Sequence, residues 1–130
     1  MKVLVYFLCF QLLLSSCRLI SPAKTYQELV GTWKEEWGAS DVTYRDVYQI
    51  AYLPNKQLII TCKDRPNYLV RKVHYNGNIL QLEIEIRDEK YNTGSANLYY
   101  QLRFVKDLQI LTGTAINHEN KVIPVKWLKQ

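Results

Sequence analysis

The chain has 130 residues, with 17 lysine and arginine side chains against 12 aspartate and glutamate side chains, which gives a net charge of +5. This length suits one domain. The basic residues are scattered, form no run and carry no nucleic-acid-binding motif, so nucleic acid is excluded as a partner. The modest positive charge suits a mixed, solvated surface beside an anionic membrane.

The first predicted element is a signal peptide over residues 1–16. Lys2 supplies a positive charge, and an apolar run of 12 residues follows from Val3 to Leu14. That run is too short for a ~30 Å hydrocarbon core, which needs about 20 residues. A short apolar run behind a positive charge is typical of an export signal. The rest of the chain has no comparable run.

The residues Leu14-Ser15-Ser16-Cys17 resemble the lipobox of bacterial lipoproteins. The resemblance implies that Cys17 is the first residue of the mature chain and carries diacylglycerol and palmitate, which anchor it in the cell envelope. Arg18 follows Cys17 where an aspartate would signal inner-membrane retention. We therefore expect an outer-membrane lipoprotein facing the periplasm if the source is Gram-negative. The alternative is an ordinary signal peptide, which leaves Cys17 available to pair with Cys62.

A tether is predicted over residues 17–24 and a single domain over residues 25–130. Thr25 is expected to cap a helical turn that ends at Leu29. Eight runs rich in β-branched and aromatic residues follow, and each is predicted to be a strand. These runs are residues 31–37, 46–53, 57–62, 68–75, 79–87, 96–104, 109–115 and 122–128.

Alternation of apolar and polar residues predicts a sheet with one dry and one wet face. It is clearest over residues 79–87 and 96–104. Asparagine and glycine between the runs, as at Asn76-Gly77, indicate tight hairpins between sequential antiparallel neighbours. The predicted fold is all-β, an eight-stranded antiparallel up-and-down barrel. A sandwich is the alternative, but closure into a barrel removes exposed strand edges.

Gly31 and Trp33, which follow the helical turn and open the first strand, resemble the glycine-x-tryptophan fingerprint of the calycins. The resemblance implies a lipocalin-like barrel in which Trp33 closes one end and Gly31 lets the chain bend into the first strand. In that family an arginine packs on the tryptophan. No secure match to it occurs here, and Lys126 or Lys129 is expected in its place.

No catalytic or metal-binding constellation is visible in the sequence. His74 and His118 lie in different hairpins without a second ligand at metal-binding spacing. Glu83 and Glu85 are predicted to lie on a solvated outer face, and so are residues 35 and 36, both glutamates. We therefore expect a protein that is not an enzyme and needs no metal or other cofactor. Cys62 is expected to be a buried small hydrophobe.

Two functions from different classes remain open. In the first, the barrel holds a small hydrophobic ligand among inward side chains, an arrangement that eight strands just allow. The residues expected to contact that ligand are Tyr48, Tyr52, Leu82, Ile84, Tyr100 and Leu102. In the second, the barrel is solid and binds an envelope protein as an inhibitor or assembly factor, through exposed tyrosines and the loops over residues 88–95 and 116–121.

Overall fold

The structure is a computed structural model, and it describes residues 26–38 and 46–130. The predicted signal peptide, the tether with Cys17, and Thr25 lie outside these residues. The described part is all-β, with eight antiparallel strands and one short 3₁₀ helix, so the predicted fold class is confirmed. The strands are β1 (Gly31–Trp37), β2 (Val47–Tyr52), β3 (Leu58–Lys63), β4 (Tyr68–Tyr75), β5 (Ile79–Arg87), β6 (Ser95–Val105), β7 (Ile110–Ile116) and β8 (Val122–Lys129), and the 3₁₀ helix is η1 (Lys106–Leu108).

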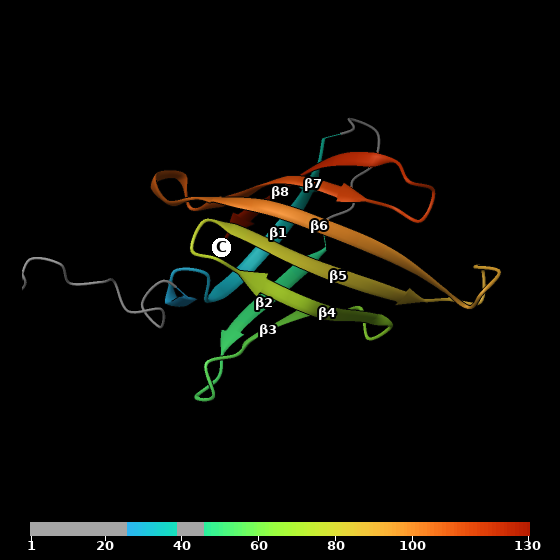
Figure 1. Cartoon of the computed structure of the whole chain (residues 1–130), viewed down its shortest axis with the longest axis horizontal. Coiled ribbons are helices and arrows are strands. Elements are labelled where there is room, and N and C mark those ends of the chain that lie inside the picture. The colour runs from blue at the N-terminus through green and yellow to red at the C-terminus, as the bar shows by residue number, and fades with distance from the viewer. Residues whose placement is uncertain (1–25, 39–45) are drawn as a thin grey trace, which may run out of the picture.

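The strands form one sheet that curls into a nearly closed barrel (Figure 1). Their order is β3-β2-β1-β8-β7-β6-β5-β4, so the first and last of the described strands are hydrogen-bonded neighbours. β3 and β4 are the two edges of the sheet, although they follow each other in sequence. Figure 1 shows that β3 and β4 diverge with distance from the loop that joins them. We call the space between them the seam.

Period-2 alternation decides which side chains fill the barrel. In β5 and β6 the inward residues are buried, and they face each other in register, as Leu82 faces Tyr100 and Leu80 faces Leu102. Both strands therefore send one apolar face into a single core that also includes β1, β2, β7 and β8. Among the described residues, none belongs to a helix long and apolar enough to cross a membrane.

One end of the barrel is closed by the turn before β1. Residues 26–29 form a helical turn in which Leu29 N donates to Tyr26 O at 3.0 Å. The indole Nε1 of Trp33 donates to Leu29 O at 2.8 Å, and both residues are fully buried. We call this the closed end, and the loops over residues 64–67, 88–94 and 117–121 lie at the opposite end.

Candidate functional site

Five of the six residues predicted to contact a ligand are buried inside the barrel. Tyr48, Ile84 and Leu102 have no accessible surface, and Leu82 and Tyr100 are 3% exposed. A cavity wide enough for a small molecule would leave accessible surface on the residues that line it. The barrel interior around these five side chains is therefore filled by protein.

The filling is aromatic. Tyr48 stacks on Trp127 with ring centroids 4.2 Å apart and an interplanar angle of 10°, and Tyr100 lies 5.8 Å from the same indole. Tyr48 and Tyr100 thus meet around a tryptophan from β8 that the sequence analysis did not place inside. Tyr52, the sixth predicted residue, is half-buried and lies apart from them, 5.5 Å from Tyr26 at the closed end.

A buried carboxylate lies at the centre of this cluster. Glu35 has no accessible surface, and its two oxygens accept from Trp37 Nε1 at 2.6 Å and from Trp127 Nε1 at 2.8 Å. Burial raises the pKa of Glu35, and the two indole donors partly offset that effect. The predicted solvated position of Glu35 was wrong. Alternation from Trp33 puts Glu35 and Trp37 on the inner face, and this signal was present in the sequence.

The tyrosine hydroxyls near Glu35 complete a polar centre in an apolar core. The hydroxyls of Tyr48 and Tyr100 are buried, and the Tyr100 hydroxyl interacts with the Tyr48 hydroxyl and with the Glu35 carboxylate. Burial raises the pKa of both phenols well above the usual value, so both remain protonated and neutral. This centre is inaccessible to solvent.

The fingerprint residues lie at the closed end, beside the last strand. Gly31 has a φ of 142°, and a Cβ there would lie 3.1 Å from Lys129 Cε. Lys129 pairs with Trp33 in register and places its Nζ 5.5 Å from the centroid of the Trp33 ring. The same Nζ donates to Glu28 O at 3.0 Å. Of the two lysines considered from sequence, Lys129 therefore packs on the tryptophan, while Lys126 is exposed.

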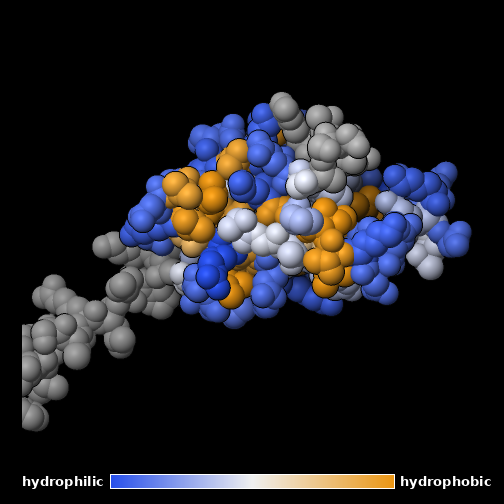
Figure 2. All heavy atoms as spheres, turned by 90° about the horizontal axis from the view of Figure 1, so that it is seen from above, coloured by the Kyte–Doolittle hydropathy of each residue, from blue (hydrophilic) through white to orange (hydrophobic). Residues whose placement is uncertain are grey.

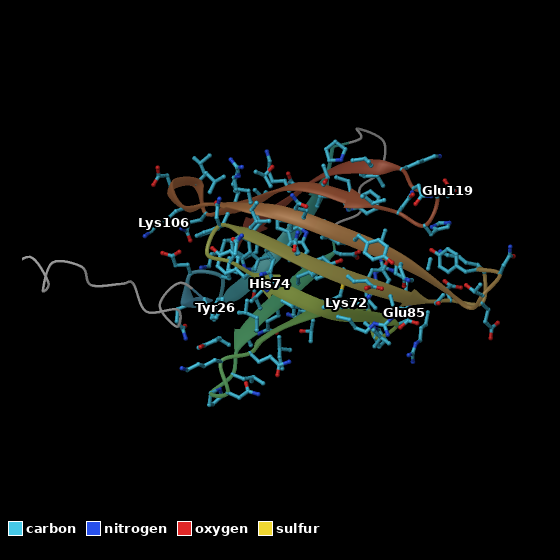
Figure 3. The ribbon with its side chains drawn as sticks, in the orientation of Figure 1. Tyr26, Lys72, His74, Glu85, Lys106 and Glu119 are labelled. Carbon is cyan, nitrogen blue, oxygen red and sulfur yellow. The ribbon has the colours of Figure 1, made fainter. Side chains whose placement is uncertain are left out.

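An accessible cleft of about 570 Å³ lies at the seam. It is lined by residues 56–60 before and along β3, by residues 70–75 of β4 and by Tyr26. Leu58, Ile60 and Val70 provide an apolar floor, since the first two are buried and the third is half-buried. Figure 3 labels Tyr26, Lys72 and His74, which lie along this opening. No pattern in the sequence indicated this cleft.

Two ion pairs cover the outer face beside the seam. Lys72 Nζ lies 2.8 Å from Glu83 Oε2, and Arg71 Nη2 lies 2.9 Å from Glu85 Oε2. Glu83 is only 4% exposed. The predicted solvated setting of Glu83 and Glu85 was therefore wrong, although both do point away from the core. The long side chains of β4 cover them.

Three tyrosines meet where the cleft reaches the closed end. Tyr26 lies 5.5 Å from Tyr52 and 6.0 Å from Tyr75 between ring centroids. The hydroxyls of Tyr52 and Tyr75 are buried and have no hydrogen-bond partner within the described residues. Burial raises the pKa of Tyr75, so its hydroxyl is a neutral donor. Tyr75 also lines the cleft, so its buried hydroxyl is an unused donor beside an accessible site.

A row of exposed apolar residues crosses the outer face of the barrel. Tyr99, Ile116 and Val122 are neighbours in register on β6, β7 and β8 and are 48%, 38% and 63% exposed. A groove of about 300 Å³ lies beside Tyr99 and Ile116. Figure 2 shows separate hydrophobic patches among hydrophilic surface on the face seen from above. We call the three residues the outer row.

The two loops predicted to contact a partner lie at the same end of the barrel. Tyr91 and His118 bring them together, with ring centroids 5.1 Å apart at an angle of 67°. Cys62, also toward this end, is buried as a free thiol whose pKa burial raises to about 12. Within residues 26–38 and 46–130 there is no group of three or more His, Cys, Asp or Glu side chains arranged to hold a metal ion.

Comparison with protein-family models, with curated proteins and with solved structures finds no match for this chain. Its fold and its sites are therefore interpreted from their own geometry.

Proposed function

We propose that this protein is a lipid-anchored, non-catalytic module of the cell envelope that binds another protein through its surface. The observation that carries the proposal is the filled interior, in which Tyr48, Ile84 and Leu102 have no accessible surface. A barrel filled by its own side chains has its seam, its outer row and its loops left for binding. Tyrosine at such surfaces combines a large contact area with a hydroxyl.

The anchor part of the proposal rests on Cys17 in its lipobox setting. An acylated Cys17, carrying palmitate, would hold the barrel at the outer membrane on the periplasmic side in a Gram-negative cell. The variant Cys17→Ser should lose membrane association in cell fractionation. A variant that still fractionates with membranes would show that Cys17 does not anchor the protein.

A small hydrophobic ligand is the second candidate function. The packing of Lys129 over Trp33 supports it, because it resembles the basic side chain on the tryptophan of the calycins, a ligand-binding family. Such a ligand would have to displace core side chains, since the residues expected to contact it are packed against one another. The observed packing therefore favours the protein-binding proposal.

Site-specific cross-linking in cells of the source organism tests the proposal. A photoreactive residue is placed singly at Tyr99 in the outer row, at His118 in the loops and at Val73 in the seam cleft, with Lys126 on β8 as an exposed control. We expect a discrete protein adduct from at least one of the first three positions and none from Lys126. Absence of an adduct at all three, with a lipid that co-purifies in fixed ratio, would favour the second candidate.

A further inference from the structure

The β3 edge presents main-chain hydrogen-bonding groups to the seam. Leu53 N donates to Gln57 O at 2.9 Å, so this pair is hydrogen-bonded between β2 and β3. Bonded and non-bonded pairs alternate along an antiparallel ladder. From the register, the main-chain groups of Ile59 therefore face β2, and those of Leu58 and Ile60 face the seam. No strand of the sheet pairs with this side of β3.

The facing edge of β4 is less regular. Arg87 N donates to Asn67 O at 3.0 Å, so by the same alternation the main-chain groups of Val70 face the seam. The register then shifts at a bulge that contains Lys72, whose φ is 52°. Bulges of this kind hinder continuous pairing along a strand edge. β3 therefore offers the regular edge for a further strand.

These main-chain groups determine what kind of molecule fits the cleft. A purely hydrophobic molecule would remove water from them without replacing the hydrogen bonds, which is unfavourable. An extended polypeptide brings N–H and C=O groups at the spacing of β3. Its alternate side chains would lie on the floor of Leu58, Ile60 and Val70. Tyr75 is 3% exposed and lines the end of that floor, and a strand that displaces it slightly would find its buried hydroxyl without a hydrogen-bond partner among the described residues.

The charge of the cleft restricts the peptide further. The lining contains Lys56, Arg71, Lys72 and His74 and no aspartate or glutamate. Arg71 and Lys72 are paired with glutamates on the outer face, whereas Lys56 forms no ion pair with any residue that the structure describes. Acidic side chains on the outward side of a bound strand would meet this basic rim.

We propose that the β3 edge binds an extended segment of another protein in which apolar residues alternate with acidic residues. The segment adds to the sheet beside β3, with its apolar side chains on the cleft floor and its acidic side chains toward the rim. The proposal rests on the proposed function and specifies both the surface and the chemistry of the partner.

Fluorescence anisotropy with the full chain tests the mode of binding. The probe is a labelled synthetic peptide of alternating valine and glutamate, which should bind saturably. Two further peptides carry N-methyl groups on all valine nitrogens or on all glutamate nitrogens. Because an added strand bonds to β3 through one alternate set only, one methylated peptide should lose binding and the other should keep it. Equal behaviour of the two methylated peptides, or no binding of the parent peptide, would overturn the proposal.

Variants of the chain locate the site. Lys56→Glu should raise the Kd of the valine–glutamate peptide by about fivefold at low salt, and Tyr75→Phe should raise it by about fivefold through loss of one hydrogen bond. The control Lys126→Glu, exposed on β8, should leave the Kd unchanged. A peptide of alternating valine and lysine should bind at least about ten times more weakly, because its lysines would be repelled by the basic side chains at the cleft.

The result also separates this proposal from the one on which it rests. If the peptide fails while cross-linking from Tyr99 or His118 captures a partner, the β3 edge is not the docking site and the protein-binding function stands. If cross-linking captures no partner from any position, the protein-binding function itself fails.

Discussion

The barrel is paired at the junction of β1 with β8 and unpaired at the seam between β3 and β4. β1 and β8, at the two ends of the described strands, pair in register from Trp33↔Lys129 to Trp37↔Val125. Glu35 joins them through the indole of Trp127. β3 and β4 are joined by a loop of four residues and yet remain unpaired edges. Six of the seven strand pairings join sequential neighbours, so the pairing of β1 with β8 and the unpaired edges of β3 and β4 are the two exceptions to that rule.

The largest expected effect tests the strength of the β1–β8 junction at the closed end. Trp33→Ala should lower the free energy of unfolding by about 3–5 kcal/mol, because it leaves a cavity and removes the hydrogen bond to Leu29 O. Urea denaturation followed by circular dichroism measures the change. The control is Ile59→Ala on β3, where the side chain is 37% exposed and the expected change is within about 0.5 kcal/mol. Similar losses in the two variants would remove the contrast between the junctions.

Replacing one oxygen of the buried Glu35 carboxylate should lower the stability of the same junction. Glu35→Gln keeps the shape of the side chain but offers one oxygen, so an indole N–H would face an amide NH₂. The expected loss is about 1–3 kcal/mol in the free energy of unfolding. Glu36→Gln, on the exposed side of β1, is the matched control and should change it by less than about 0.5 kcal/mol. An equally mild effect at both positions would mean that Glu35 is not held as described.

Burial of Glu35 should also appear in the pH dependence of stability. Burial raises its folded-state pKa above the ordinary value of a glutamate side chain. The folded protein therefore binds the proton more tightly than the unfolded chain does. The resulting stabilisation is complete below the unfolded pKa and is lost as the pH rises through the raised folded pKa. The difference in unfolding free energy between the native protein and Glu35→Gln should decrease across that window, and a constant difference would contradict the account.

A smaller effect is expected where Lys129 covers Trp33. Lys129→Met keeps most of the alkyl packing but removes the hydrogen bond to Glu28 O and the charge over the indole. We expect a loss of about 1 kcal/mol in thermal or urea unfolding. Lys126→Met, exposed on the same strand, is the control and should be close to neutral. Equal effects would indicate that Lys129 acts only as a surface charge.

At the seam we expect the main-chain edges of β3 and β4 to be unpaired and the side chains beneath them to be packed so as to exclude solvent. The thiol of Cys62, on β3, is buried, and its pKa is raised to about 12. Alkylation of Cys62 by iodoacetamide at about pH 8, mapped by mass spectrometry, should be slow in the folded protein and fast in urea. Fast labelling under native conditions would show that β3 and β4 separate widely in solution.

Much of the fold followed from patterns within single strands. The predicted and observed bounds agree for β1, β4 and β5, and at the remaining five strands each bound that differs does so by one residue. Tight turns and period-2 alternation were sufficient for this because both are local signals. The alternation of Trp33, Glu35 and Trp37 also contained the buried carboxylate, but a charged residue in a strand was interpreted as solvated. The charge of Glu35 was given more weight than its place in the alternation, and the prediction was wrong.

The seam was beyond a strand-by-strand prediction. Two sequential strands with a short connection normally pair, and the residues of β4 beside the seam are unremarkable in sequence. Lys72 leaves the ladder at a positive φ and reaches Glu83 on the outer face. That arrangement depends on the partner strand β5, so it becomes visible only when the two strands are placed together.

Native mass spectrometry of the full chain tests the central claim, that the barrel is solid, most directly. A covalent lipid on Cys17 would remain after denaturation, whereas a ligand held in the interior would be released. The account predicts that folded and denatured protein have the same mass. A reproducible mass present only in the folded protein, and retained when the seam is altered by Lys56→Glu and Tyr75→Phe, would place a ligand inside the barrel and contradict the account.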